Sequence, residues 1–178
     1  MSEVEVLNRG KFLNFCKSSN GWEYAERSNC SGCVGILAVT EQEEIILVTQ
    51  YRPPVQTHVL ELPAGLVGDE EEGEGILIAA DRELLEETGF KAKKWIDCGE
   101  TVPSAGACSE KVSLALATGA YKVAEGGGVD DEEIQTHLVP IKEIKNYIKY
   151  MRNKGFEIDS KIYAGLWFYQ ASKNEGSC

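Results

Sequence analysis

The pattern of apolar and polar positions predicts strands first, then a helix, more strands and two final helices. Segments 12–17 and 22–27 are predicted to pair, because they flank Ser18-Ser19-Asn20-Gly21 and Asn-Gly is a strong hairpin signal. Further runs rich in strand-forming residues cover 33–39, 45–51, 59–62, 95–101, 111–117 and 134–140. Short polar or Pro- and Gly-containing stretches separate several of these runs, as expected for strands joined by turns.

The longest helical pattern covers residues 76–88, which contain neither Pro nor Gly and are rich in Ala, Leu and Glu. Gly89 follows as the expected left-handed C-terminal cap. On a helical projection Leu77, Ala80 and Leu84 share one stripe, so this face is predicted to pack against the sheet. The segment is therefore an amphipathic helix.

Three acidic residues of this helix, Glu83, Glu86 and Glu87, fall together on the side opposite the apolar stripe. Like charges at this spacing repel and destabilise an isolated helix. Bound Mg²⁺ or Mn²⁺, which prefer oxygen ligands, would remove the repulsion. The alternative is an ordinary acidic face in contact with water.

Two helices are predicted near the C-terminus. Residues 141–150 form a short one, and Asp159 is placed as the N-cap of the last, whose apolar stripe contains Ile162, Leu166 and Tyr169. Strands, helix, strands and helices in this order predict an α+β fold, an α/β/α sandwich with a mixed sheet, rather than regular βαβ repeats.

Composition narrows the class of protein. The 178 residues fit one domain, and 43% hydrophobic with 26% charged residues is ordinary for a globular protein. A net charge of −11 argues against nucleic-acid binding, and an anionic substrate would require local positive charge such as bound metal ions. The sequence contains no apolar run of membrane-spanning length and no leader pattern, so a cytoplasmic location is expected.

The six cysteines, at positions 16, 30, 33, 98, 108 and 178, are expected to be free thiols. Cys30-Ser-Gly-Cys33 has the spacing of half a zinc site or of a redox pair. The sequence has no second pair of this kind, and neither His58 nor His137 stands at ligand spacing from it. We therefore expect no metal or redox role for this segment.

The acidic helix belongs to a longer motif. Gly68 is followed after five residues by Glu74, and after seven more by the sequence RELLEETGF at 82–90. This resembles the Nudix box, G-x5-E-x7-R-E-U-x-E-E-x-G-U with U apolar, at every fixed position. The resemblance implies metal-dependent hydrolysis of a diphosphate linked to a nucleoside, and it gives Gly68, Glu74 and Gly89 the structural positions of the box.

Two upstream segments make the resemblance closer. Gln50-Tyr51-Arg52-Pro53-Pro54 and Glu61-Leu62-Pro63-Ala64-Gly65 are similar to the QYRPP and E-x-PAG segments of the ADP-ribose pyrophosphatase branch of the Nudix superfamily. That branch implies a Nudix α/β/α sandwich with an N-terminal antiparallel β-subdomain, usually exchanged in a homodimer. By this resemblance residues 1–30 form the subdomain, 31–172 the catalytic domain and 173–178 a flexible tail.

The resemblance also implies roles for the residues of the box. Glu83 and Glu87 would coordinate two or three Mg²⁺ or Mn²⁺ ions, with Glu86 in the same cluster and the carbonyl of Ala64 as a further ligand. Arg82 would pair with a box carboxylate and fix its direction.

Other residues would contact the substrate, which the resemblance identifies as a nucleotide sugar. Arg52 would bind the diphosphate and Trp22 would stack on the base, while Glu23 and Arg27 would reach the substrate from the neighbouring subunit. Glu110 would lie near the terminal ribose. Simple packing at the hairpin is the alternative for Trp22, and an ion pair at the end of a strand is the alternative for Arg52.

The family places its catalytic base on a glutamate in the loop before the strand at 134–140. Here that loop reads AEGGGVDDEEIQ over 124–135, and Glu132 is the predicted base, with Glu133 and Asp130 as alternatives.

The chain departs from the family pattern in two places. Gly65 stands three residues before the box glycine, which an insertion within 68–73 explains, and Ala105 occupies a position that in the ADP-ribose group typically holds proline. The second departure bears on the substrate and leaves the reaction class intact. The alternatives are therefore hydrolysis of GDP-mannose, a dinucleoside polyphosphate or a nucleoside triphosphate, or non-catalytic binding of ADP-ribose.

Overall fold

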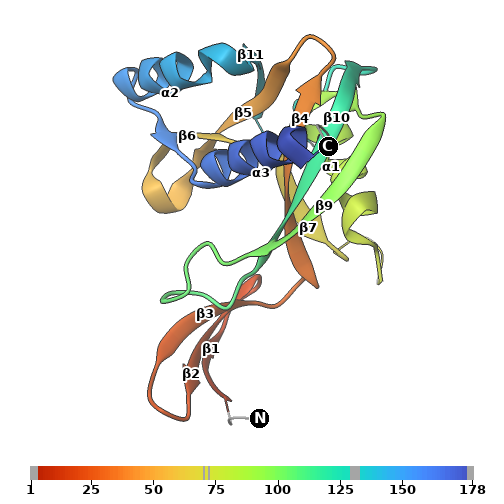
Figure 1. Ribbon diagram of the computed structural model, residues 1–178. Helices are drawn as coiled ribbons and strands as arrows, with labels where there is room; N and C mark the ends of the chain where they lie inside the picture. The colour runs from red at the N-terminus through yellow and green to blue at the C-terminus, as the bar shows by residue number, and fades with distance from the viewer. Residues whose placement is uncertain (1–3, 70, 72, 129–132, 176–178) are drawn as a thin grey trace.

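The computed structural model describes residues 4–69, 71, 73–128 and 133–175. A small N-terminal sheet lies at one end of a larger body in which helices cover a mixed sheet (Figure 1). The strands are β1 Val4–Arg9, β2 Leu13–Ser18, β3 Glu23–Arg27, β4 Gly32–Thr40, β5 Glu44–Arg52, β6 Thr57–Glu61, β7 Ala64–Val67, β8 Phe90–Lys91, β9 Lys94–Thr101, β10 Val112–Lys122, β11 Gln135–Pro140 and β12 Glu157–Ile158. The α-helices are α1 Ile76–Thr88, α2 Ile144–Asn153 and α3 Lys161–Glu175, and short 3₁₀ turns cover Pro53–Val55 and Ile141–Glu143.

The main sheet is mixed, as predicted. Its central path runs β12-β6-β5-β4-β10-β8 among the described residues, with β11 added to β5, β7 to β4 and β9 to β10. Strands β4 and β10 pair in parallel and so do β12 and β6, whereas the other pairs are antiparallel. The α+β class and the layered sandwich expected from the sequence are confirmed.

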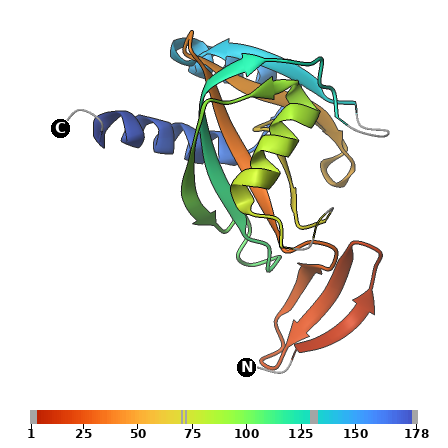
Figure 2. The same cartoon turned by 90° about the vertical axis from the view of Figure 1, so that its right-hand side faces the viewer.

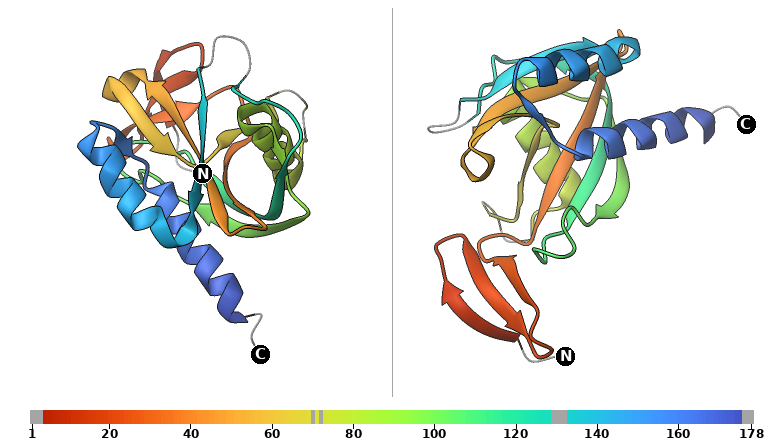
Figure 3. Two further views of the ribbon diagram at one scale, coloured as in Figure 1. Left: turned by 90° about the horizontal axis from the view of Figure 1, so that it is seen from above. Right: turned by 90° about the vertical axis from the view of Figure 1, so that its left-hand side faces the viewer.

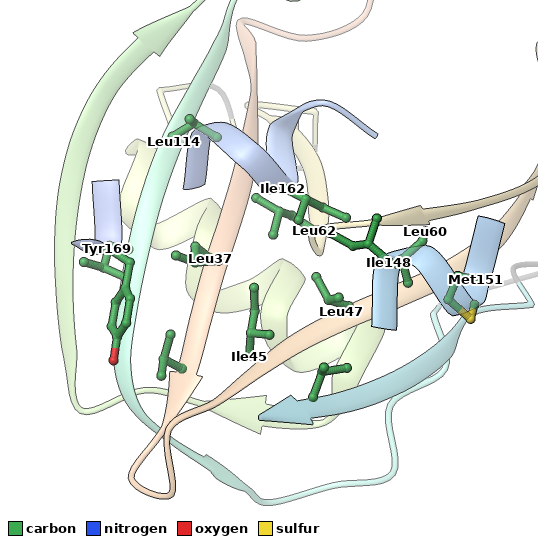
Figure 4. Close-up of a cluster of buried hydrophobic side chains, with 13 residues drawn as sticks. Leu37, Ile45, Leu47, Leu60, Leu62, Leu114, Ile148, Met151, Ile162 and Tyr169 are labelled. Atoms are coloured by element: carbon green, nitrogen blue, oxygen red, sulfur yellow. The ribbon is translucent and has the colours of Figure 1, made fainter. Parts of the chain in front are cut away.

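Two hydrophobic clusters lie on opposite faces of the sheet. On one face α1 packs Ala80 and Leu84 against Val34, Ile36 and neighbouring strand residues (Figure 2). On the other face α2 and α3 cover the second cluster, whose labelled members include Leu37, Leu47, Leu60, Ile148 and Ile162 (Figure 4). Seen from above, α1 lies on the opposite side of the strands from α2 and α3 (Figure 3, left).

The box helix has the bounds that the sequence predicted. It begins at Ile76 and ends at Thr88, and Gly89 adopts φ 72° while its N–H bonds the Leu85 carbonyl. Ala80 and Leu84 are buried on the predicted stripe, whereas the neighbouring Ile78 is 68% exposed. Helix α3 continues to Glu175. It therefore includes residues 173–175, for which a flexible tail was expected.

The N-terminal sheet is antiparallel in the order β1-β2-β3, and Gly21 at φ 87° forms the hairpin turn predicted at Asn-Gly. Strand β1 was not predicted. The sheet touches the body through the loop before β10: Ala25 exchanges backbone hydrogen bonds with Ala107 and Ser109. The described cysteines are free thiols, and no helix among the described residues combines the length and apolar character needed to cross a bilayer.

Candidate active site

Arg82 organises the acidic side of α1. Its guanidinium donates to Glu74 at 3.2 and 3.3 Å, to Glu83 at 2.8 Å, to Glu86 at 3.2 Å and to the Leu66 carbonyl at 3.1 Å. Burial works against its charge, but the hydrogen bonds and the neighbouring carboxylates raise the pKa of Arg82. The residue thus pairs with box carboxylates, as the sequence predicted, and joins three of them at once.

Glu74 fixes the loop before the helix to this network. Its second oxygen also accepts a hydrogen bond from the Gly68 N–H at 3.1 Å, and its side chain is 6% exposed. The hydrogen bond from Arg82 holds the pKa of Glu74 below its ordinary value. Gly68 has φ 77°, a conformation that favours glycine, so the first box glycine has a local structural reason.

Glu83 lies against strand β7. A Cβ atom added to Gly65 would stand 1.8 Å from the Glu83 carboxyl carbon, so only glycine leaves room for this carboxylate. Burial raises the pKa of Glu83 to about 7, although Arg82 lowers it, and the charges of Glu86 and Asp69 raise it further. The site therefore holds an acidic group that gains from a cation beside it.

Replacing Gly65 by Ala is expected to displace the Glu83 carboxylate and to lower kcat/KM by about 100-fold, because small shifts of catalytic groups cost that much. Steady-state hydrolysis of the nucleotide sugar expected from the sequence, at a fixed excess of Mg²⁺, measures the change in kcat/KM. Gly75→Ala is the matched control, since its Cβ would meet only the flexible end of Ile78 at 3.7 Å. Equal kcat/KM in both variants would show that hydrolysis does not depend on the position of the Glu83 carboxylate.

Glu87 is buried, with 4% of the residue exposed, and its carboxylate accepts a hydrogen bond from the Ala64 N–H at 3.1 Å. Helix α1 and strand β7 thus bring Glu83 and Glu87 beside the segment Ala64–Gly65, and Arg82 links Glu86 to Glu83. Among the described residues, no group of three or more acidic, histidine or cysteine side chains already converges where a cation could sit. Arg82 donates to both Glu83 and Glu86 here, and all three glutamates supply the oxygen donors that Mg²⁺ and Mn²⁺ prefer.

Arg52 lies at the end of β5 and forms a two-point ion pair with Glu61 of β6, with distances of 2.7 and 2.9 Å. The Glu61 side chain is 5% exposed and that of Arg52 is 42% exposed, so one face of the guanidinium remains open to solvent. The hydrogen bonds to Glu61 raise the pKa of Arg52, and the charges of Glu87 and Asp159 add to the effect. The ion pair expected as the alternative role of Arg52 is therefore present, and it holds Arg52 near the box.

A cavity of about 420 Å³ adjoins the box loop and is lined by Arg27, Cys33, Glu74 and Glu110, among others. Glu110 accepts hydrogen bonds from Arg27 at 2.8 Å and from the Cys33 thiol at 3.3 Å. Burial alone would raise its pKa, but these contacts lower the pKa of Glu110. Burial and Glu110 raise the pKa of Cys33 to about 12. Arg27, expected to act on a neighbouring subunit, here contacts a residue of its own chain.

Trp22 and Glu23 stand at the edge of the N-terminal sheet. Trp22 is 59% exposed, and its indole N–H donates to the Gly106 carbonyl at 3.2 Å. Glu23 is exposed and pairs in register with Lys17 of β2. Neither residue is buried in a core, so Trp22 keeps a ring face available for stacking.

The predicted base and one of its alternatives, Glu132 and Asp130, lie outside the described residues. The other alternative, Glu133, is exposed at the start of the segment that leads to β11.

The sequence did not indicate Glu61 as the partner that holds Arg52. Glu61 is buried and charged at once, and its place in the E-x-PAG segment beside a QYRPP strand was a usable signal.

Comparisons with known proteins agree with this geometry. The NUDIX domain family model matches residues 32–164. The methanol dehydrogenase activator of Bacillus methanolicus is 34% identical over 78% of this chain and 72% of its own length. The ADP-ribose pyrophosphatase of Bacillus subtilis strain 168 is 38% identical over 57% of this chain and 54% of its own length.

Matches over a greater share of the chain are also found. The ADP-sugar pyrophosphatase of Mus musculus is 27% identical over 92% of this chain and 84% of its own length. A solved crystal structure of an ADP compounds hydrolase has the same fold, with a TM-score of 0.71, 20% identity and coverage of 98% of this chain and 94% of that one.

Proposed function

The chain belongs to the Nudix family, and from that premise we propose that it hydrolyses the diphosphate of ADP-ribose or a related nucleoside diphosphate sugar. The products are a nucleoside monophosphate and a sugar phosphate. One observation carries the proposal: the buried acidic cluster of α1 lies beside Ala64 and Gly65, with Arg52 near it and a polar cavity next to the box loop. Relatives that carry the names ADP-ribose and ADP-sugar pyrophosphatase support the choice of substrate.

Two or three Mg²⁺ or Mn²⁺ ions would be held by Glu83, Glu86, Glu87 and the Ala64 carbonyl. When bound, such ions neutralise the charge that develops on phosphoryl oxygens. Glu83 and Glu86 share Arg82 in this structure, and their carboxylates would supply oxygen ligands to a bound metal ion. Arg82 keeps its bonds to Glu74 and to the Leu66 carbonyl and continues to position the helix.

The remaining residues bind and orient the substrate. The open face of Arg52 contacts the diphosphate, Trp22 stacks on the base, and Glu23 lies beside it. Arg27 and Glu110 face the terminal sugar, whose hydroxyl groups suit a cavity lined with charged and polar side chains. Glu132 takes the proton of the attacking water as one phosphorus–oxygen bond of the anhydride breaks.

We propose a homodimer formed through the N-terminal sheet. That sheet and its turns expose several large apolar side chains: Val4, Leu7, Phe12, Leu13, Phe15 and Trp22. Exposed apolar patches of this kind mark protein interfaces, and a second copy would cover them.

Incubation of the purified protein with a substrate panel and Mg²⁺ or Mn²⁺, followed by chromatography, tests the proposed reaction. ADP-ribose is expected to give AMP and ribose 5-phosphate, and chelation by EDTA is expected to stop the reaction. The panel includes GDP-mannose, a dinucleoside polyphosphate and nucleoside triphosphates. Preferential cleavage of one of these would overturn the substrate, and binding of ADP-ribose without products would overturn the reaction.

A further inference from the structure

Lys161 is a half-buried cation at the first position of α3. Its backbone N–H donates to Asp159 Oδ1 at 2.6 Å, and its ammonium forms an ion pair with the other oxygen of Asp159. The Lys161 side chain is 19% exposed and that of Asp159 is 16% exposed. An ammonium has three donors, so one carboxylate does not use its full hydrogen-bonding capacity.

Strand β4 leaves room for this side chain. A Cβ at Gly35 would lie 3.5 Å from Lys161 Cδ and 3.3 Å from Leu114 Cδ2, so the lysine stem runs directly over the glycine. Cys33, two residues earlier, points to the same face of β4 and bonds Glu110. Lys161 therefore lies on the same face of β4 as Cys33, which is one of the residues lining the cavity, and its charge contributes to the lowered pKa of Glu110.

The partner of Lys161 connects it to the other half of the site. The Asp159 N–H bonds the Leu60 carbonyl at 3.0 Å, next to Glu61, and β12 pairs with β6 at this point. Glu61 holds Arg52 in its two-point ion pair. Lys161 thus stands between the Arg52–Glu61 pair and the Arg27–Glu110 pair, where a diphosphate with a sugar attached would pass from one to the other.

We propose that Lys161 is a substrate-binding residue whose ammonium contacts the phosphoryl group on the sugar side of the diphosphate; this inference rests on the proposed function. Arg52 and Arg27 each pair with a carboxylate, as Lys161 does, so in a chain of net charge −11 an anionic diphosphate would gain from a third cation between these two arginines. In a purely structural role, Lys161 would only neutralise Asp159, whose carboxylate accepts the hydrogen bond at the start of α3.

The kinetics of the Lys161→Met variant distinguish a substrate-binding lysine from a purely structural one. We expect kcat/KM for ADP-ribose to fall by about 10- to 100-fold, the size of one charge-assisted hydrogen bond. Inhibition by ribose 5-phosphate should weaken by a similar factor while inhibition by AMP stays the same. Lys161→Arg should recover part of the loss. Lys173→Met is the matched control, because Lys173 lies on the same helix and pairs with Glu43.

A measurement on the unaltered protein keeps the test decisive if Lys161→Met does not fold. Reductive methylation followed by mass spectrometry should show that ribose 5-phosphate protects Lys161 and that AMP does not. Unchanged ribose 5-phosphate inhibition in a folded Lys161→Met variant, or no protection by ribose 5-phosphate, would overturn the inference alone. Absence of any nucleoside diphosphate sugar hydrolysis by the unaltered protein would instead overturn the proposed function.

Discussion

Glu87→Gln is expected to lower the hydrolysis of ADP-ribose by on the order of a thousandfold, because a lost metal ligand removes several kcal/mol of transition-state stabilisation. Gln has the shape of Glu and still accepts the hydrogen bond from the Ala64 N–H, so the helix should stay in place. Only the negative charge is lost. Turnover at saturating Mg²⁺ measures the effect, and thermal unfolding checks that the fold persists.

Asp81→Asn provides the matched control for this variant. Asp81 is an acidic residue of the same helix, but it faces Lys91 at 3.6 Å and is 39% exposed. We expect its activity to equal that of the unaltered protein. A Glu87→Gln variant as active as Asp81→Asn would contradict the assignment of Glu87 as a metal ligand.

Arg82→Met is expected to cost about 3 to 5 kcal/mol of folding free energy, the usual loss when one partner of a buried ion pair is removed. Of the carboxylates that lose their guanidinium in this variant, two are largely buried: Glu74, which is 6% exposed, and Glu83, which is 12% exposed. Urea unfolding at pH 7.5 measures the loss. Arg82→Lys should be intermediate, because an ammonium keeps the charge but not the planar fork that reaches several acceptors.

The loss in Arg82→Met should depend on pH in a defined direction. The pKa of Glu83 in the folded state is raised from 4.5 to about 7. Below pH 4.5 the carboxyl is protonated in both states, so this shift does not affect stability. As pH rises from 4.5 through 7, the unfolded state loses its proton first, and the shift destabilises the fold. Without Arg82 the pKa of Glu83 rises further. The difference in stability between the two proteins should therefore be larger at pH 8 than at pH 5. A pH-independent difference below 1 kcal/mol would show that Arg82 does not hold this cluster together.

The sequence predicted those parts of the site that lie within one helix or one short motif. The bounds of α1, the Gly89 cap and the contact of Arg82 with box carboxylates follow from spacing and helical geometry. Strand β7 was not predicted, because its four residues, Ala64–Val67, follow a proline and become a strand by pairing with β4. Its position nevertheless determines where the glutamates of α1 lie.

Contacts between distant strands could not be predicted. The pairing of β5 with β6 brings Arg52 to Glu61, and contact of β3 with the loop before β10 places Arg27 beside Glu110. Each contact depends on strand register, which the local sequence does not specify.

Binding of metal ions by Glu83 and Glu87 can be seen in a crystal soaked with Mn²⁺ and a non-hydrolysable ADP-ribose analogue, with diffraction measured at the manganese absorption edge. We expect anomalous peaks within metal–oxygen bonding distance of Glu83 and Glu87, next to the Ala64 carbonyl. Well-ordered density for the analogue with no anomalous peak beside α1 would contradict it.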